Sequence, residues 1–159
     1  MKEKEWKPIV LADAARRGIC RQYTGLLEKC ENLTDFLRLY RRGADWALTN
    51  DVPSLNMLRR FAEERLDLHG IYVDKAFDGE TLWDRQVYIL RNCHGTIRTG
   101  LNIDKRIIPI FYIADGSDIT IESANGDYLL HPVRIEAHLY GNSNVNCEDT
   151  KKLQCTKYK

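Results

Sequence analysis

Five arginine side chains are the residues of this sequence best suited to ligand chemistry. They fall in two consecutive predicted helices: Arg38, Arg41 and Arg42 in the first, and Arg59 and Arg60 in the second. A guanidinium group presents a planar fork of donors that can hold two phosphate oxygens at once. On antiparallel neighbouring helices the five would form one anion-binding patch. The alternative is a solvated helix face, neutralised by Asp45, Glu63 and Glu64.

Other reactive side chains do not form a recognisable catalytic motif. Cys93 and His94 are adjacent, as a thiol beside a base would be, but a buried cysteine next to a turn explains the same pair. The carboxylates of the C-terminal half are explained by turn capping. The four histidines lack the close spacing of metal ligands: His69, His94, His131 and His138. We therefore assign no catalytic residue, no metal site and no cofactor.

The composition is that of an ordinary globular protein, with 159 residues, 43% of them hydrophobic and 30% charged. The formal net charge is +1, whereas a dedicated nucleic-acid binder usually has a basic excess. No apolar run approaches the roughly 20 residues that a membrane span needs. The odd number of cysteines, the absence of a C-x-x-C pair and the polar start favour free thiols and a cytoplasmic location.

Apolar residues at helical spacing predict a helical region over residues 1–70. The first helical stretch covers 9–30, with Gly18 as either a kink or a break between two helices. The second covers 34–50, with Thr34 as its N-cap. The third begins near Leu55 and ends near Gly70. Because the connections are short, we expect a three-helix bundle.

Residues 71–159 change to alternation of period two, broken by Gly, Asn, Asp and Ser, which predicts strands with tight turns. Residues 114–122 resemble residues 140–148 at an offset of 26, which would place Ser117 over Ser143 and Ile119 over Val145. Repetition of this kind is typical of chains whose coils stack on one another. The predicted class is therefore α+β, with the three-helix bundle followed by a short β-solenoid. A small antiparallel β-sandwich or meander is the alternative.

The stretch Leu33–Tyr40, the segments 53–55 and 69–74, and the Gly-Asn-Ser repeats together resemble small uncharacterised proteins of phages and bacterial mobile elements. The resemblance covers the chain from about residue 33 to its end. It implies helices followed by β-coils, and an accessory, host-interaction or counter-defence role. It supplies no catalytic residues to transfer.

From these patterns we expect a non-catalytic binding protein that binds a host protein or sequesters a small phosphorylated ligand, such as a nucleotide. The edges of stacked β-coils favour self-association, so a homo-oligomer is expected. Two alternatives stay open. One is a small enzyme that uses a carboxylate or the Cys93/His94 pair between the halves. The other is a nucleic-acid binder that uses the arginine patch.

Overall fold

The structure is a computed structural model that describes residues 5–61, 63–102, 107–124, 129–130 and 134–158. The chain divides into two compact units, Met1–His69 and Gly70–Lys159, called here the helical unit and the β unit. Each is described by itself. Among the described residues, no helix combines the length and the apolar character needed to cross a membrane.

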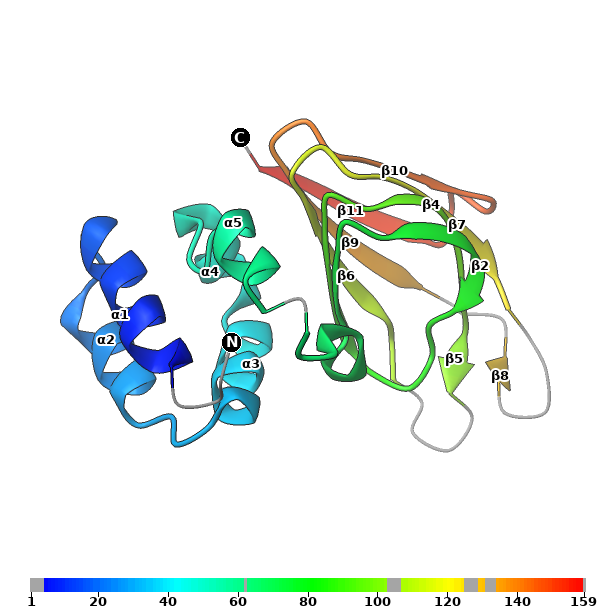
Figure 1. Ribbon diagram of the computed structural model, residues 1–159. Helices are drawn as coiled ribbons and strands as arrows, with labels where there is room; N and C mark the ends of the chain where they lie inside the picture. Colours follow the sequence, from blue (N-terminus) through cyan, green and yellow to red (C-terminus); the bar gives the residue numbers. More distant parts are fainter. Residues whose placement is uncertain (1–4, 62, 103–106, 125–128, 131–133, 159) are drawn as a thin grey trace. The chain divides into compact units, whose positions relative to one another are not determined.

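The helical unit contains, within the described residues, five α-helices and one short 3-10 helix (Figure 1). The elements are α1 (Trp6–Arg16), α2 (Arg21–Glu28), α3 (Leu33–Arg42), α4 (Ala44–Asn50), α5 (Leu55–Arg59) and η1 (Leu66–His69). Aromatic side chains join several of them. Phe36 of α3 stacks on Trp6 of α1, with ring centroids 5.3 Å apart, and the ring centroid of Phe61 lies 6.4 Å from that of Phe36. All three rings are buried, so they hold α3 in the core of the unit.

The expected three-helix bundle is wrong because glycine and capping residues divide the helical stretches further. Gly18 separates α1 from α2, and Gly43 ends α3 and precedes α4. The expected N-cap at Thr34 is also wrong. The side chain of Asn32 accepts a hydrogen bond from the amide of Asp35 at 2.9 Å, so α3 begins one residue before Thr34. Apolar spacing shows which face is buried, but it does not show where a helix stops.

The β unit contains two parallel sheets and one short antiparallel pair. The five-stranded sheet has the order β1 (Ile71–Val73), β3 (Val87–Arg91), β6 (Ile110–Ala114), β9 (Ile135–Tyr140) and β11 (Leu153–Tyr158). The four-stranded sheet has the order β10 (Asn144–Cys147), β7 (Asp118–Ser123), β4 (His94–Thr99) and β2 (Ala76–Thr81). The antiparallel pair is β5 (Leu101–Asn102) with β8 (Leu129–Leu130).

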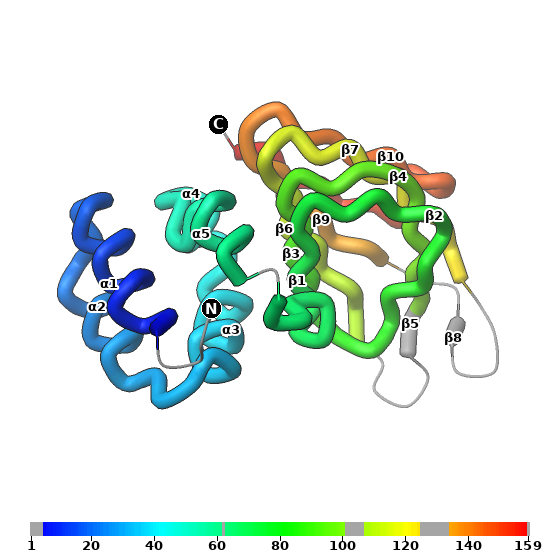
Figure 2. The backbone as a smooth tube through the Cα atoms, viewed as in Figure 1, coloured from blue at the N-terminus to red at the C-terminus, as the bar shows by residue number. Residues whose placement is uncertain are grey.

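The chain passes repeatedly from the five-stranded sheet to the four-stranded sheet and back. Figure 2 shows β2, β4, β7 and β10 side by side, each reached from a strand of the other sheet. The register expected from the 26-residue offset is confirmed, because Val145 pairs with Ile119 and Ala137 with Phe111. Inward-facing residues of both sheets form one apolar cluster. It includes Tyr88 stacked on Phe111, with centroids 5.2 Å apart.

The fold class expected from the sequence is corrected to α/β. The structure has two parallel sheets of five and four strands and, within its described part, five helices. This arrangement contradicts the helical bundle with a β-solenoid, and also the antiparallel sandwich. Period-two alternation predicts which residues face inward in a strand, but it is the same for parallel and antiparallel neighbours. The direction of the strands and the number of sheets therefore could not be taken from the alternation.

Candidate functional site

The helical unit has a pocket of about 210 Å³ between α2 and α3, called here the basic pocket. Its lining combines three cations with one carboxylate and three apolar or sulfur-bearing side chains: Lys29, Arg38, Arg42, Asp35, Leu26, Cys30 and Leu39. The lining cations exceed the lining carboxylates by two charges. The chemistry that fits such a lining is the binding of an anion.

Local helix geometry brings the cations together. Arg38 and Arg42 are four residues apart on α3, so their Cβ atoms lie on one helix face roughly 5–6 Å apart. Lys29 is the C-cap residue of α2, and it reaches the same pocket from the other wall. The side chain of Lys7 donates to the carbonyl oxygens of Glu28 and, at 2.9 Å, Cys30. The segment that carries Lys29 is therefore tied to α1.

The single carboxylate of the basic pocket, Asp35, already makes contacts within the protein. Asp35 accepts a hydrogen bond from the amide of Glu31 at 3.1 Å, and it lies 3.9 Å from the guanidinium group of Arg38. Across the described part of the chain, neither Lys29 nor Arg42 makes an ion pair. The side chains of Lys29 and Arg42 are both exposed to solvent. Two positive charges are therefore available to an incoming anion.

The structure divides the arginine patch that the sequence predicted. Arg38 and Arg42 line the basic pocket, while Arg41 is half-buried and lines none of it. The other two, Arg59 and Arg60, are exposed and also lie outside the lining, and Arg59 donates to the side chain of Asn56 at 3.2 Å. Sequence reasoning missed Lys29, because it follows a different helix and no spacing rule links it to α3.

In the β unit, the Cys93/His94 pair does not form a nucleophile beside a base. Cys93 is fully buried, whereas His94 is exposed on β4. The Cys93 thiol donates to the carbonyl oxygens of Tyr72 and Arg91, each at 3.4 Å. Burial raises the pKa of this thiol to about 11, so it stays protonated near neutral pH. The geometry therefore favours a structural cysteine at this position.

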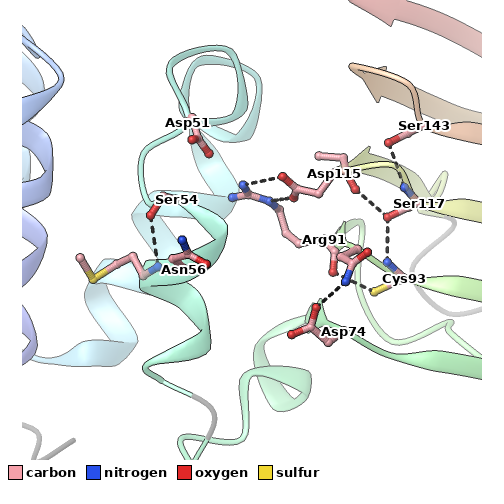
Figure 3. A network of polar contacts seen from close by, with 12 residues as sticks. Asp51, Ser54, Asn56, Asp74, Arg91, Cys93, Asp115, Ser117 and Ser143 are labelled. Carbon is pink, nitrogen blue, oxygen red and sulfur yellow. Dashed lines mark hydrogen bonds and ion pairs between the residues drawn. The ribbon is translucent and has the colours of Figure 1, made fainter.

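The polar groups around Cys93 stabilise a corner of the β unit (Figure 3). Ser117 Oγ accepts from the amide of Cys93 at 2.8 Å, and Ser143 Oγ accepts from the amide of Ser117 at 3.2 Å. Arg91, almost fully buried, forms an ion pair with Asp115. These serines sit one above the other, as the 26-residue offset predicted. The network satisfies buried amides and explains these polar residues without catalysis.

No group of three or more His, Cys, Asp and Glu side chains able to hold a metal ion occurs among the described residues. His131, one of the four histidines considered above, lies outside them. Of the carboxylates in the β unit, Glu122 faces Arg98, with the charged atoms 3.4 Å apart. This exposed pair is a common surface arrangement and suggests no acid–base chemistry.

Comparisons of the chain with models of protein families, with curated proteins and with solved structures found no match. The resemblance to small proteins of phages and mobile elements therefore stays a prediction. No relative supplies a ligand, partner or catalytic residue that can be carried over to this chain.

The burial of Cys93 leads to a prediction about thiol reactivity. At pH 8, an alkylating or disulfide-exchanging reagent should modify the exposed Cys20 and Cys155 and react with Cys93 at least about a hundredfold more slowly. The pKa difference from the ordinary value of 9.0 reduces the thiolate fraction by about that factor. The Cys93 thiol loses its proton only as the pH rises towards 11, so its protection should weaken there.

Peptide mass spectrometry measures the modification rate of each cysteine. Equal rates for Cys93 and Cys155 would contradict the buried position, and unfolding in urea should remove the difference.

Proposed function

We propose that the protein is a non-catalytic binding protein whose basic pocket holds a small phosphorylated ligand. The observation that carries this proposal is the convergence of Lys29, Arg38 and Arg42 on one pocket whose single carboxylate, Asp35, is engaged by the protein itself. Phosphate groups carry the concentrated negative charge that such a set of cations attracts.

The geometry of the arginines suits phosphate in particular. Two guanidinium groups one helical turn apart can bind neighbouring oxygens of one phosphate or of two linked phosphates. Lys29 adds a point charge from the opposite wall. The pocket is open and small, so it favours a compact anion over a long polymer. For the same reason we place a nucleic-acid strand second among anionic partners.

The pocket lining favours binding over catalysis. Besides Lys29, whose charge the proposal uses, the lining residues that could act as a nucleophile or a base are Cys30 and Asp35. Burial raises the pKa of the Cys30 thiol, which donates to the carbonyl oxygen of Leu26 at 3.4 Å. Asp35 holds the start of α3 through the amide of Glu31. Both side chains therefore make hydrogen bonds within the protein that support the local structure.

A binding protein without chemistry of its own acts by holding its ligand or by presenting a surface. Together with the predicted resemblance to phage and mobile-element proteins, the basic pocket supports a counter-defence role in which a phosphorylated signal is sequestered. A host-protein partner and a homo-oligomer remain predictions. The edge strands of the two sheets are the segments that could mediate them: β1, β11, β10 and β2.

Calorimetric titration with inorganic pyrophosphate tests the proposal. The wild-type protein should bind it, and replacing Arg38 and Arg42 together by glutamine should weaken binding at least about tenfold. A charge-assisted hydrogen bond contributes about 1.5–3 kcal/mol, and 1.4 kcal/mol corresponds to a factor of ten. Glutamine keeps a high helix propensity, so α3 should persist.

The double variant Arg59→Gln with Arg60→Gln is a matched control, since it removes the same charge from two exposed arginines outside the pocket. Its affinity for pyrophosphate should stay within about twofold of the wild type, because it leaves the lining of the basic pocket unchanged. If both double variants lost affinity equally, the binding would reflect total charge. If the wild type failed to bind, the proposal would be wrong.

A further inference from the structure

A second pocket adjoins the basic pocket along α2. It has a volume of about 220 Å³ and is called here the aromatic pocket. Its lining is mostly apolar and aromatic: Cys20, Gln22, Tyr23, Leu26 and Trp46. The anion-binding function proposed above does not use this pocket. Because the aromatic pocket lies next to the three cations of the basic pocket, one ligand could contact both.

Leu26 lines both pockets, so the two are neighbours that meet at this side chain. Along α2, the lining residues recur at 22–23, 26 and 29–30, the spacing of one helix face. The opposite wall runs from Arg42 in the basic pocket to Trp46 in the aromatic pocket, four residues further along the chain. At a rise of 1.5 Å per residue, the face from 23 to 30 extends about 10 Å. The two adjoining pockets are together called here the groove, with a basic end and an aromatic end.

The aromatic end contains a polar group that lacks a partner. The ring of Tyr23 lies against that of Trp46, with centroids 4.2 Å apart and an angle of 32° between the rings. Tyr23 is only 7% exposed, and its hydroxyl makes no hydrogen bond to any described residue. Burial raises the pKa of Tyr23, so the hydroxyl keeps its proton and can donate. A buried hydroxyl without a partner is uncommon, and an acceptor on a bound ligand would satisfy it.

The size of the groove favours one ligand that spans both ends. Small-ligand sites usually have volumes of about 300–1,000 Å³. Each pocket alone falls below that range, whereas the combined volume of the two lies within it. The exposed Leu26 at the junction, 42% accessible, offers an apolar contact to the middle of such a ligand.

We infer that the groove binds a nucleoside phosphate, with the base at the aromatic pocket against Trp46 and the phosphates held by Lys29, Arg38 and Arg42. This inference rests on the proposed function, which supplies the phosphate end. A nucleobase is flat, stacks on aromatic rings and carries ring nitrogens and carbonyl oxygens that accept hydrogen bonds. The hydroxyl of Tyr23 would be the donor to one of these acceptors.

Calorimetric titration of the intact protein with three probes separates the two ends of the groove. The probes are inorganic pyrophosphate, adenosine and adenosine diphosphate. Adenosine diphosphate should bind at least about tenfold more tightly than pyrophosphate, since base–aromatic stacking commonly contributes a factor of that order. Adenosine alone should bind weakly, because it lacks the phosphates.

Variants at each end should have separate effects. Trp46→Ala should remove the tenfold advantage of adenosine diphosphate and leave pyrophosphate affinity within about twofold. Tyr23→Phe, which keeps the ring and removes only the hydroxyl, should lower the affinity for adenosine diphosphate severalfold. Trp83→Ala is the control, because Trp83 is exposed in the β unit and should change neither affinity. Thermal unfolding of each variant verifies that it is folded. If Trp46→Ala does not fold, Tyr23→Phe alone tests the aromatic end.

The outcomes distinguish this inference from the proposed function. Equal affinities for pyrophosphate and adenosine diphosphate would overturn the inference and leave the proposed function intact. A parallel loss of both affinities in folded Trp46→Ala would also overturn it, because the tryptophan would then act on the whole helical unit. Binding of none of the probes would overturn both proposals.

Discussion

Replacing Gly95 by alanine should destabilise the β unit by at least about 3 kcal/mol. Gly95 has a φ of +113°, and a Cβ atom there would lie 2.1 Å from the carbonyl oxygen of Phe77. Because that oxygen belongs to the backbone of the paired strand β2, no side-chain rotation can relieve the contact. The substitution therefore has two costs: it strains the backbone at residue 95, and it pushes β2 away from β4. Chemical denaturation, followed by hydrogen exchange of peptides from residues 76–99, measures the loss.

Gly79→Ala is a matched control for this prediction. Gly79 also has a positive φ, +85°, and lies in the same strand pair, but a Cβ atom there would meet nothing within 4 Å. Its cost should be that of the left-handed backbone alone, about 1–2 kcal/mol. Similar losses for Gly95→Ala and Gly79→Ala would show that β2 and β4 do not approach each other as closely as the structure has them.

In the β region, the alternation predicted inward-facing residues, because burial follows period two locally, and the 26-residue repeat predicted one register. Ile119 and Ile121 are fully buried, and the pairing of Ile119 with Val145 follows from matching turns 26 residues apart. The position of Gly95 was not predictable in the same way. Its tight contact depends on β2, a strand whose pairing with β4 appears in no local pattern.

In the helical unit, the sequence predicted part of the lining of the basic pocket. Arg38 and Arg42 share a pocket because a helix repeats nearly every four residues, which can be predicted. The inclusion of Lys29 and the exclusion of Arg59 and Arg60 depend on how α2, α3 and α5 pack. That packing follows from contacts such as Trp6 with Phe36, whose partners lie 30 residues apart. The aromatic pocket was missed for the same reason, since Tyr23 and Trp46 come from different helices.

The packing of α3 can be tested at Phe36, where alanine should destabilise the helical unit by about 3–5 kcal/mol. The ring is fully buried and contacts both Trp6 and Phe61, so its removal leaves a cavity between α1 and α3. Phe36→Leu, which refills much of that space, should cost clearly less. Both Arg38 and Arg42 follow Phe36 on α3, and the loosened helix should therefore also bind pyrophosphate less tightly.

Hydrogen exchange of α3 amides, measured with and without pyrophosphate, separates the two effects of Phe36→Ala. Without ligand, the variant should exchange faster over residues 33–42 while peptides from residues 110–123 of the β unit keep their protection. With saturating pyrophosphate, part of the protection should return, because a ligand that binds only the folded unit stabilises it. If exchange rose equally in both units, Phe36 would support the whole chain. If Phe36→Ala left exchange in α3 unchanged, the aromatic contacts would not hold the helix that carries the basic pocket.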